Sequence, residues 1–323
     1  MDRSRAVLIA GIALGLLCCI ALGGAGPSAS LPSEIRWLAP GADKIEALLF
    51  EPASCYAPAR DPDTRTLEDI GRAVFASPSL LGGQAARAGL SCASCHSGGR
   101  TNPHFFFPGL SGAAGTADVT TSLLSEKRGD GQANPIPIPD LAAPRSAVKI
   151  PREDGAALQA FIRGLIVEEF AGPEPAPRVL QGLAAYVRAI NPQACPAKTR
   201  QRLTPAGAIE GIVESVRAAD AALAENDNAV AISLLAAARA GLGRLSERFP
   251  AEEDGPLRAS LSSASQELAL ARELARSDPA QAHWQITLFL ARTPSWADRV
   301  LAAAPHSLFD AETIRGYFSP VPS

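Results

Sequence analysis

The sequence predicts an all-α protein, and three observations lead to that prediction. Alanine is abundant whereas aromatic residues make up only 5% of the 323 residues, a composition that favours helices. Apolar residues recur at helical spacing in most segments after Thr66. Pairs typical of helix starts, such as Thr204-Pro205, stand where these segments begin. We expect two domains after an N-terminal leader, over residues 31–197 and 198–323.

Residues 1–30 have the three-part form of a secretory signal peptide. The short segment Asp2-Arg3-Ser4-Arg5 precedes an unbroken apolar run from Ala6 to Leu22, and small residues follow it. The run is also just long enough for an uncleaved membrane anchor, which is the alternative interpretation. We expect an exported, periplasmic protein that meets the membrane at most through this segment. The net charge of −3, with no basic block, predicts no nucleic-acid partner.

The pentapeptide Cys92-Ala93-Ser94-Cys95-His96 has the attachment signature of a c-type haem. On a helical turn Cys92 and Cys95 project to nearly the same side, so both thiols can form thioethers to the vinyl groups of one porphyrin. His96 then directs its imidazole at the iron as the proximal ligand. A thioredoxin-like site would need a surrounding βαβ pattern, and a structural zinc site a second ligand pair nearby; the sequence has neither. We therefore expect one covalent heme c held by Cys92, Cys95 and His96.

Two cysteines remain once the leader and the haem motif are set aside. These are Cys55 and Cys195, which stand on either side of the haem segment. An even remainder in an oxidising compartment predicts a disulfide, with two unrelated buried thiols as the alternative. A bridge across a loop of this length would contribute about 4–5 kcal/mol in the chain-entropy model.

Helices are expected on both sides of the haem motif. Thr66 to Ala76 has one apolar face, and Ser77-Pro78 ends it. The stretch from Ser97 to Pro151 is rich in Gly, Pro, Asn and Asp, and its alternating prolines at 135–139 exclude a helix and a central strand. A loop of this length is expected to wrap the porphyrin. Two further helices are predicted over 154–170 and 178–190.

Four runs in this region form a set: Gly71-Arg72-Ala73-Val74-Phe75-Ala76-Ser77-Pro78, Leu90-Ser91-Cys92-Ala93-Ser94-Cys95-His96, Ile138-Pro139-Asp140-Leu141 and Leu183-Ala184-Ala185-Tyr186-Val187. Together they resemble a class I cytochrome c domain of the bacterial cytochrome c peroxidase and MauG family. In that family a helix precedes the haem motif by about the number of residues that separates the Gly71 run from Cys92 here. A closing helix with a Leu-x-x-Tyr pattern crosses that first helix. The resemblance extends from about Leu67 to Asn191, under half of the chain, and implies a helical haem domain with redox chemistry.

The chain departs from this family in haem number and in iron ligation. Family members carry two Cys-x-x-Cys-His motifs and this chain has one, so the two-haem relay of such peroxidases cannot be built within it. Its single methionine is Met1, which excludes methionine ligation from within the haem domain. Three alternatives remain for the sixth ligand: His104, an open or water-occupied position with His104 nearby, and a ligand from a lysine, another residue or the other domain. Arg128 and Arg145 are candidates for pairing with a haem propionate.

From about Lys198 the chain reads as an up-down helical bundle. The predicted helices begin after Thr204, near Asn228, at Pro256, at Pro279 and after Asp310, and the fourth carries Trp284 and Leu288. Their apolar stripes indicate core packing, and His283 and His306 are expected at the surface or at helix ends. The bundle carries no recognisable chemistry and is expected to dock a redox partner or to be a structural addition.

These observations predict an exported monohaem c-type cytochrome that exchanges electrons with a protein partner through the haem edge. The first alternative is an enzyme, a cytochrome c peroxidase-like protein with an open haem site. The second is a haem-based ligand-binding or scaffold protein, in which the haem senses a small ligand or the bundle holds a complex together.

Overall fold

The described part of the chain is largely helical. A computed structural model describes residues 32, 37–121, 123–124, 127, 129–144, 150–151 and 154–319. The predicted leader over residues 1–30 and the propionate candidates Arg128 and Arg145 lie outside these residues. Within them, helices make up most of the chain and strands only a few short pairs, so the all-α prediction is confirmed.

The elements are as follows. The α-helices are α2 (Lys44–Leu49), α3 (Pro62–Phe75), α4 (Gly83–Arg87), α5 (Cys92–Cys95), α6 (Gly155–Gly164), α7 (Pro177–Ala189), α8 (Pro205–Ala224), α9 (Asn228–Glu247), α10 (Gly255–Ser277), α11 (Pro279–Ala303) and α12 (Ala311–Phe318). Short turns are η1 (Pro78–Leu80), η2 (Ser97–Gly99), the π-helical η4 (Leu165–Glu169), η5 (Pro192–Ala194), η6 (Glu252–Asp254) and η7 (Ala304–His306). The strands are β1 (Phe50–Pro52), β2 (Thr116–Ala117), β3 (Ile136–Pro137) and β4 (Arg200–Arg202).

Helix α3 begins earlier than the apolar periodicity predicts. Asp61 caps it, because its carboxylate accepts a hydrogen bond from the Thr64 backbone N–H at 2.9 Å. Pro62 occupies the first turn, where its missing N–H costs nothing. The cap and the proline therefore start the helix before its first apolar residue, and the predicted end near Ser77 is confirmed.

Helices α3 and α7 cross at two glycines. A Cβ placed on Gly71 would lie 2.0 Å from the carbonyl oxygen of Gly182, so the two backbones are in direct contact. One turn further along, Phe75 packs edge-on against Tyr186 of α7, with ring centroids 5.2 Å apart. The predicted closing helix over 178–190 is confirmed as α7.

The predicted helix over 154–170 is correct in position but not uniform. It consists of α6, capped by Asp154, and then the π-helical turn η4. Before this helix, in the described residues between Ser97 and Pro151, β2 lies antiparallel to β3. Ile136–Pro137 is a two-residue edge strand, in agreement with the prediction that these prolines exclude a helix and a central strand.

The N-terminal part of the described chain holds two elements that we did not predict. Helix α2 is short, and β1 after it pairs antiparallel with β4, about 150 residues later in the chain. Behind this pair, Leu48 and Leu49 form a small buried cluster with Leu308 and Ile314. The C-terminal helix α12 is thus fixed against α2.

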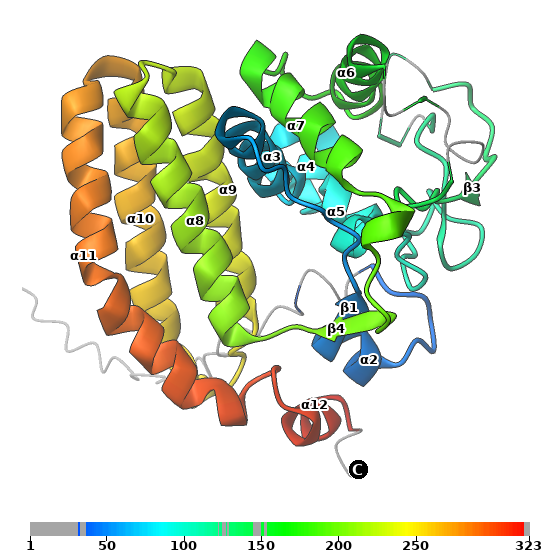
Figure 1. Cartoon of the computed structure of the whole chain (residues 1–323). Coiled ribbons are helices and arrows are strands. Elements are labelled where there is room, and N and C mark those ends of the chain that lie inside the picture. The colour runs from blue at the N-terminus through cyan, green and yellow to red at the C-terminus, as the bar shows by residue number, and fades with distance from the viewer. Residues whose placement is uncertain are drawn as a thin grey trace, which may run out of the picture. The chain divides into compact units, whose positions relative to one another are not determined.

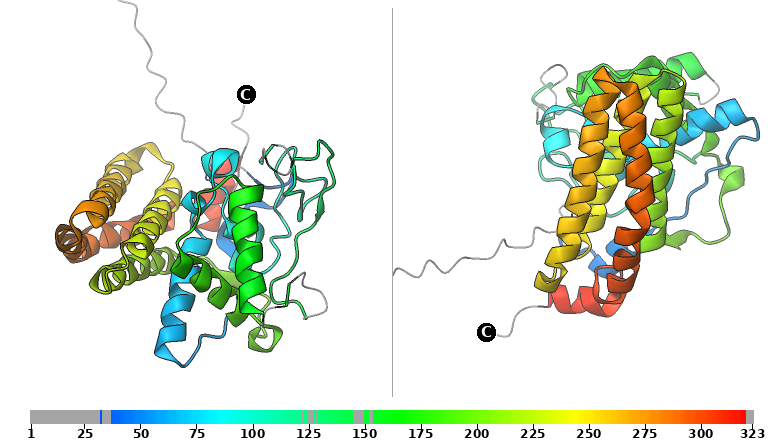
Figure 2. Two further views of the ribbon diagram at one scale, coloured as in Figure 1. Left: turned by 90° about the horizontal axis from the view of Figure 1, so that it is seen from above. Right: turned by 90° about the vertical axis from the view of Figure 1, so that its left-hand side faces the viewer.

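Helices α8 to α11 form the predicted bundle (Figures 1 and 2). Each packs against the next along the chain, and α11 closes the bundle against α8. The buried face of α11 consists of residues such as Ala282, Ile286 and Phe289. Trp284, which we assigned to the fourth helix, is 59% exposed and lies outside that core. Helix α9 is long and apolar enough to cross a membrane, but half of its apolar stretch is buried in the protein, as is typical of a core helix.

The bundle and the haem-motif region share one hydrophobic core. Helix α3 packs against α8 and α9, and Arg72 forms an ion pair with Glu214 of α8 at 2.8 Å. Arg244 of α9 donates a hydrogen bond to the Ala76 carbonyl at the end of α3 at 2.9 Å. Residues 31–323 accordingly form one compact unit. The division at residues 197 and 198 stays a prediction from the sequence.

Candidate functional site

The predicted haem motif lies on a single helical turn. Helix α5 spans Cys92–Cys95, and the backbone N–H of His96 donates to the Cys92 carbonyl at 2.9 Å. Ser91 and Ser94 form a reciprocal capping box at its start, in which the Ser94 hydroxyl accepts from the Ser91 backbone N–H at 3.0 Å. The local sequence therefore fixes a turn that directs Cys92 and Cys95 to one side, with His96 directly after them.

Both thiols of the motif are free and partly accessible. Burial raises the pKa of Cys92 and of Cys95 to about 12 in each case. Each of the two residues keeps some accessible surface, but protein atoms surround both sulfurs and keep most water away from them. A redox-active cysteine pair of the thioredoxin kind needs a lowered thiol pKa, so this environment does not favour that chemistry.

The imidazole of His96 is sheltered in the same way. Burial lowers its pKa to about 4, and the nearby Pro139 carbonyl and Asp140 charge oppose that shift only in part. Its Nδ1 is buried and has no hydrogen-bond partner among the described residues. The ring of Phe75 lies 6.4 Å away. His96 is therefore neutral at pH 7 and holds a nitrogen lone pair that a metal could use.

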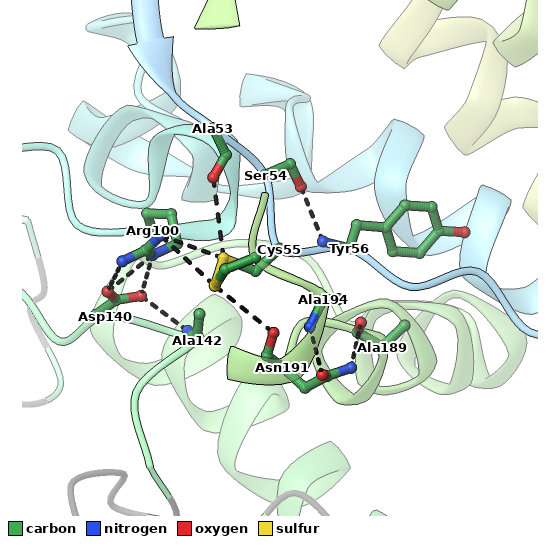
Figure 3. Close-up of a disulfide and its surroundings, with 11 residues drawn as sticks. Ala53, Ser54, Cys55, Tyr56, Arg100, Asp140, Ala142, Ala189, Asn191 and Ala194 are labelled. Atoms are coloured by element: carbon green, nitrogen blue, oxygen red, sulfur yellow. Dashed lines mark hydrogen bonds and ion pairs between the residues drawn. A yellow bond between two sulfur atoms is a disulfide. The ribbon is translucent and has the colours of Figure 1, made fainter. Parts of the chain in front are cut away.

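The predicted disulfide between Cys55 and Cys195 is present (Figure 3). The two sulfurs are bonded at 2.03 Å and close a loop of 140 residues. Backbone hydrogen bonds align the two partner segments, as Asn191 donates to the Cys55 carbonyl at 3.1 Å and Ala53 to the Thr199 carbonyl at 3.0 Å. The bridge therefore joins the chain before the haem motif to the chain after α7.

The residues after His96 fold back onto the motif turn. The Asn102 backbone N–H donates to the Cys95 carbonyl at 2.8 Å, and its side-chain amide donates to the Ser94 carbonyl at 2.9 Å. The Thr101 hydroxyl donates to the Ile138 carbonyl at 2.9 Å and ties in the segment that contains Pro139. The long loop therefore returns to the motif, which is what wrapping a bound group requires.

His104 lies beside a different surface of the motif turn. It lines a pocket of about 480 Å³ together with Ala93, Ser94 and Ser97. On a helical turn Ala93 and Ser94 face away from Cys92 and Cys95, and neither cysteine nor His96 belongs to the described lining. The described contacts do not bring His104 to His96, so His104 as the sixth ligand stays a prediction.

Two histidines of the bundle lie at the surface, as expected. The side chain of His283 is 61% exposed and its Nδ1 lies 2.6 Å from the Asp220 carboxylate. His306 is exposed in the turn that follows α11. No group of three or more His, Cys, Asp or Glu side chains lies close enough to hold a metal ion in the part of the chain that the structure describes.

Sequence reasoning missed two residues of this region, Arg100 and Asp140. They form an ion pair with an N–O distance of 2.6 Å, next to the disulfide. They are separated by 40 residues of irregular chain, so no local pattern links them. Of the two, only Asp140 lies in a run that the sequence singled out, Ile138-Pro139-Asp140-Leu141.

Comparison with family models, with curated proteins and with solved structures found no match to this chain. Two free thiols on one turn, a neutral imidazole directly after them and a buried ring nitrogen without a partner fit the protein side of a covalent haem. The donor set fits a zinc ion less well, since a structural zinc site needs four ligands and the described residues hold no group of even three.

Proposed function

We propose that this protein is an exported monohaem c-type cytochrome that carries electrons to or from a protein partner. The observation that supports it most is the juxtaposition of Cys92, Cys95 and His96 on and directly after one capped helical turn. Cys92 and Cys95 would hold the porphyrin and His96 would bind its iron. A haem bound in this way supplies a one-electron iron couple.

The chain's own residues have three tasks in this function. The α5 turn orients the two thiols, and the contact between Asn102 and Cys95 closes the loop over the turn. The desolvated surroundings of His96 keep its nitrogen unprotonated, which metal ligation requires. Phe75, whose ring lies 6.4 Å from the imidazole, and the returning loop would shield one side of the imidazole from water.

Export is part of the proposal and has two supports. The leader over residues 1–30 has signal-peptide composition, and the Cys55–Cys195 disulfide is typical of a protein that folds in an oxidising compartment. The fold that we propose for residues 31–197 is that of a cytochrome c domain, with α3 and α7 as its two crossed long helices. A redox protein is the proposed partner.

A second candidate function follows from the position of His104. Because His104 lines a separate pocket with Ala93 and Ser94, it supplies no evident sixth ligand, and the single methionine is Met1. An open iron position permits peroxide or small-ligand chemistry. A peroxidase-like enzyme is therefore the alternative.

Absorption spectra of the purified full-length protein test both candidates. We expect a reduced pyridine-adduct spectrum with one haem per chain that survives denaturation, and its loss in the Cys92→Ala/Cys95→Ala variant. The matched control is Cys55→Ala/Cys195→Ala, which also removes two cysteine sulfurs, but those of the disulfide and not those of the motif turn. This variant should retain covalent haem. A six-coordinate, low-spin ferric spectrum that ignores peroxide and cyanide favours electron transfer, whereas high-spin iron that binds peroxide favours the enzyme.

A further inference from the structure

Arg100 and Asp140 form an ion pair with bidentate geometry beside the disulfide (Figure 3). Arg100 Nε donates to Asp140 Oδ1 at 2.7 Å and Oδ2 at 2.8 Å, and Nη2 lies 2.6 Å from Oδ2. The side chains are 29% and 28% exposed, so both charges are shielded from much of the solvent. A pair with this geometry holds both partners in one orientation.

The disulfide lies against the other side of the same guanidinium. Arg100 Nη1 is 3.2 Å from Sγ of Cys55, a residue with no exposed surface, and 3.9 Å from Sγ of Cys195. The guanidinium thus lies between the Asp140 carboxylate and a disulfide whose Cys55 half is buried and whose Cys195 half is exposed.

The pair is also held close to His96. Asp140 directly follows Pro139, whose carbonyl faces the imidazole, and Thr101 fixes the preceding Ile138 carbonyl at 2.9 Å. Arg100 lies one short turn after His96, where the Gly99 backbone N–H donates to the His96 carbonyl at 3.0 Å. The positive charge of Arg100 and the negative charge of Asp140 are therefore both held near His96, the proposed iron ligand.

We propose that the Arg100–Asp140 pair sets the reduction potential of the metal centre at His96, with the disulfide holding Arg100 in place. This inference rests on the proposed function. Oxidised iron carries one more positive charge than reduced iron, so a nearby carboxylate stabilises the oxidised form and a guanidinium opposes it. While paired, the two charges largely cancel. Replacing Arg100 removes a positive charge and replacing Asp140 removes a negative one, so the two replacements shift the potential in opposite directions.

The test is a redox titration of the haem spectrum in the full-length protein. Arg100→Gln should lower the midpoint potential and Asp140→Asn should raise it. We expect a threefold to tenfold change in the reduction equilibrium for each, which is about 28–59 mV for one electron. The partial exposure of both groups limits the effect to this range.

Three further variants separate a charge effect from a packing effect. Arg100→Lys keeps the charge and should restore most of the wild-type potential, and the double variant Arg100→Gln/Asp140→Asn should lie near wild type. Arg276→Gln, which breaks the more exposed pair with Glu273 on α10, should leave the potential unchanged. If Arg100→Gln fails to fold, Asp140→Asn and the double variant still decide the sign.

Shifts of the same sign in both single variants, or no shift in either while each retains covalent haem, would overturn the inference and leave the proposed function intact. Wild-type protein without covalent haem would overturn the proposed function itself, and this inference with it.

Discussion

The contact between Gly71 of α3 and Gly182 of α7 leads to a prediction about the stability of the site. Replacing Gly71 with alanine adds a Cβ 2.0 Å from the Gly182 carbonyl oxygen, 2.4 Å from its carbonyl carbon and 2.9 Å from the Leu183 nitrogen. All three are backbone atoms, so no side-chain rotation can relieve the overlap. The two helices must move apart, and this would also separate Phe75 from Tyr186 and disturb the ring that packs near His96.

The expected magnitude combines two opposing effects. Alanine in place of glycine within a helix is intrinsically favourable by about 1 kcal/mol. Overpacking of a tight contact costs about 1–3 kcal/mol and more where the backbone must shift. We therefore expect Gly71→Ala to lower the free energy of unfolding by about 2 kcal/mol, which corresponds to a urea midpoint lower by roughly 1 M.

Gly243 provides the matched control. It lies in α9, and an added Cβ there meets no atom within 4 Å. Gly243→Ala should therefore leave stability unchanged or raise it by up to about 1 kcal/mol. Urea unfolding followed by circular dichroism measures both variants. If Gly71→Ala proves as stable as Gly243→Ala, the two backbones are not in contact at this crossing.

Two more predictions concern His104 and the start of α3. His104→Ala should leave the haem absorption spectrum unchanged if the imidazole stays in its pocket beside Ala93; a low-spin ferric spectrum that becomes high-spin in this variant would instead identify His104 as the sixth ligand. The backbone N–H and hydroxyl of Thr64 hold the pKa of Asp61 below its usual value. A lowered folded-state pKa contributes stability that is present above the unfolded-state pKa and is lost as the pH falls through the folded-state value. Asp61→Asn should therefore weaken the acid-side pH dependence of the thermal midpoint, and an identical pH profile in the variant would contradict the capping role.

Local signals account for most of what the sequence predicted correctly. The starts of α8 and α11 follow from a capping side chain and a proline in the first turn, all within a few residues of one another. The Cys55–Cys195 bridge followed from counting cysteines. The motif turn α5 followed from the spacing of Cys92 and Cys95.

What the sequence did not predict depends on partners that are distant along the chain. Strand β1 is too short to show a period and exists because β4 pairs with it. The Arg100–Asp140 pair joins two ends of an irregular loop. Trp284 is apolar and lies near the helical stripe of α11, yet the small Ala282 occupies the buried position instead. Periodicity shows that a face is apolar, but which large residue at its edge is covered depends on the neighbouring helix.

The most direct measurement of the central claim is the intact mass of the denatured full-length protein, produced in a host that attaches c-type haem. We expect the mass of the chain plus one haem, and a proteolytic peptide containing Cys92 and Cys95 that carries the added group. A chain of unmodified mass, with both of these cysteines open to thiol reagents, would contradict the claim that this turn holds a haem.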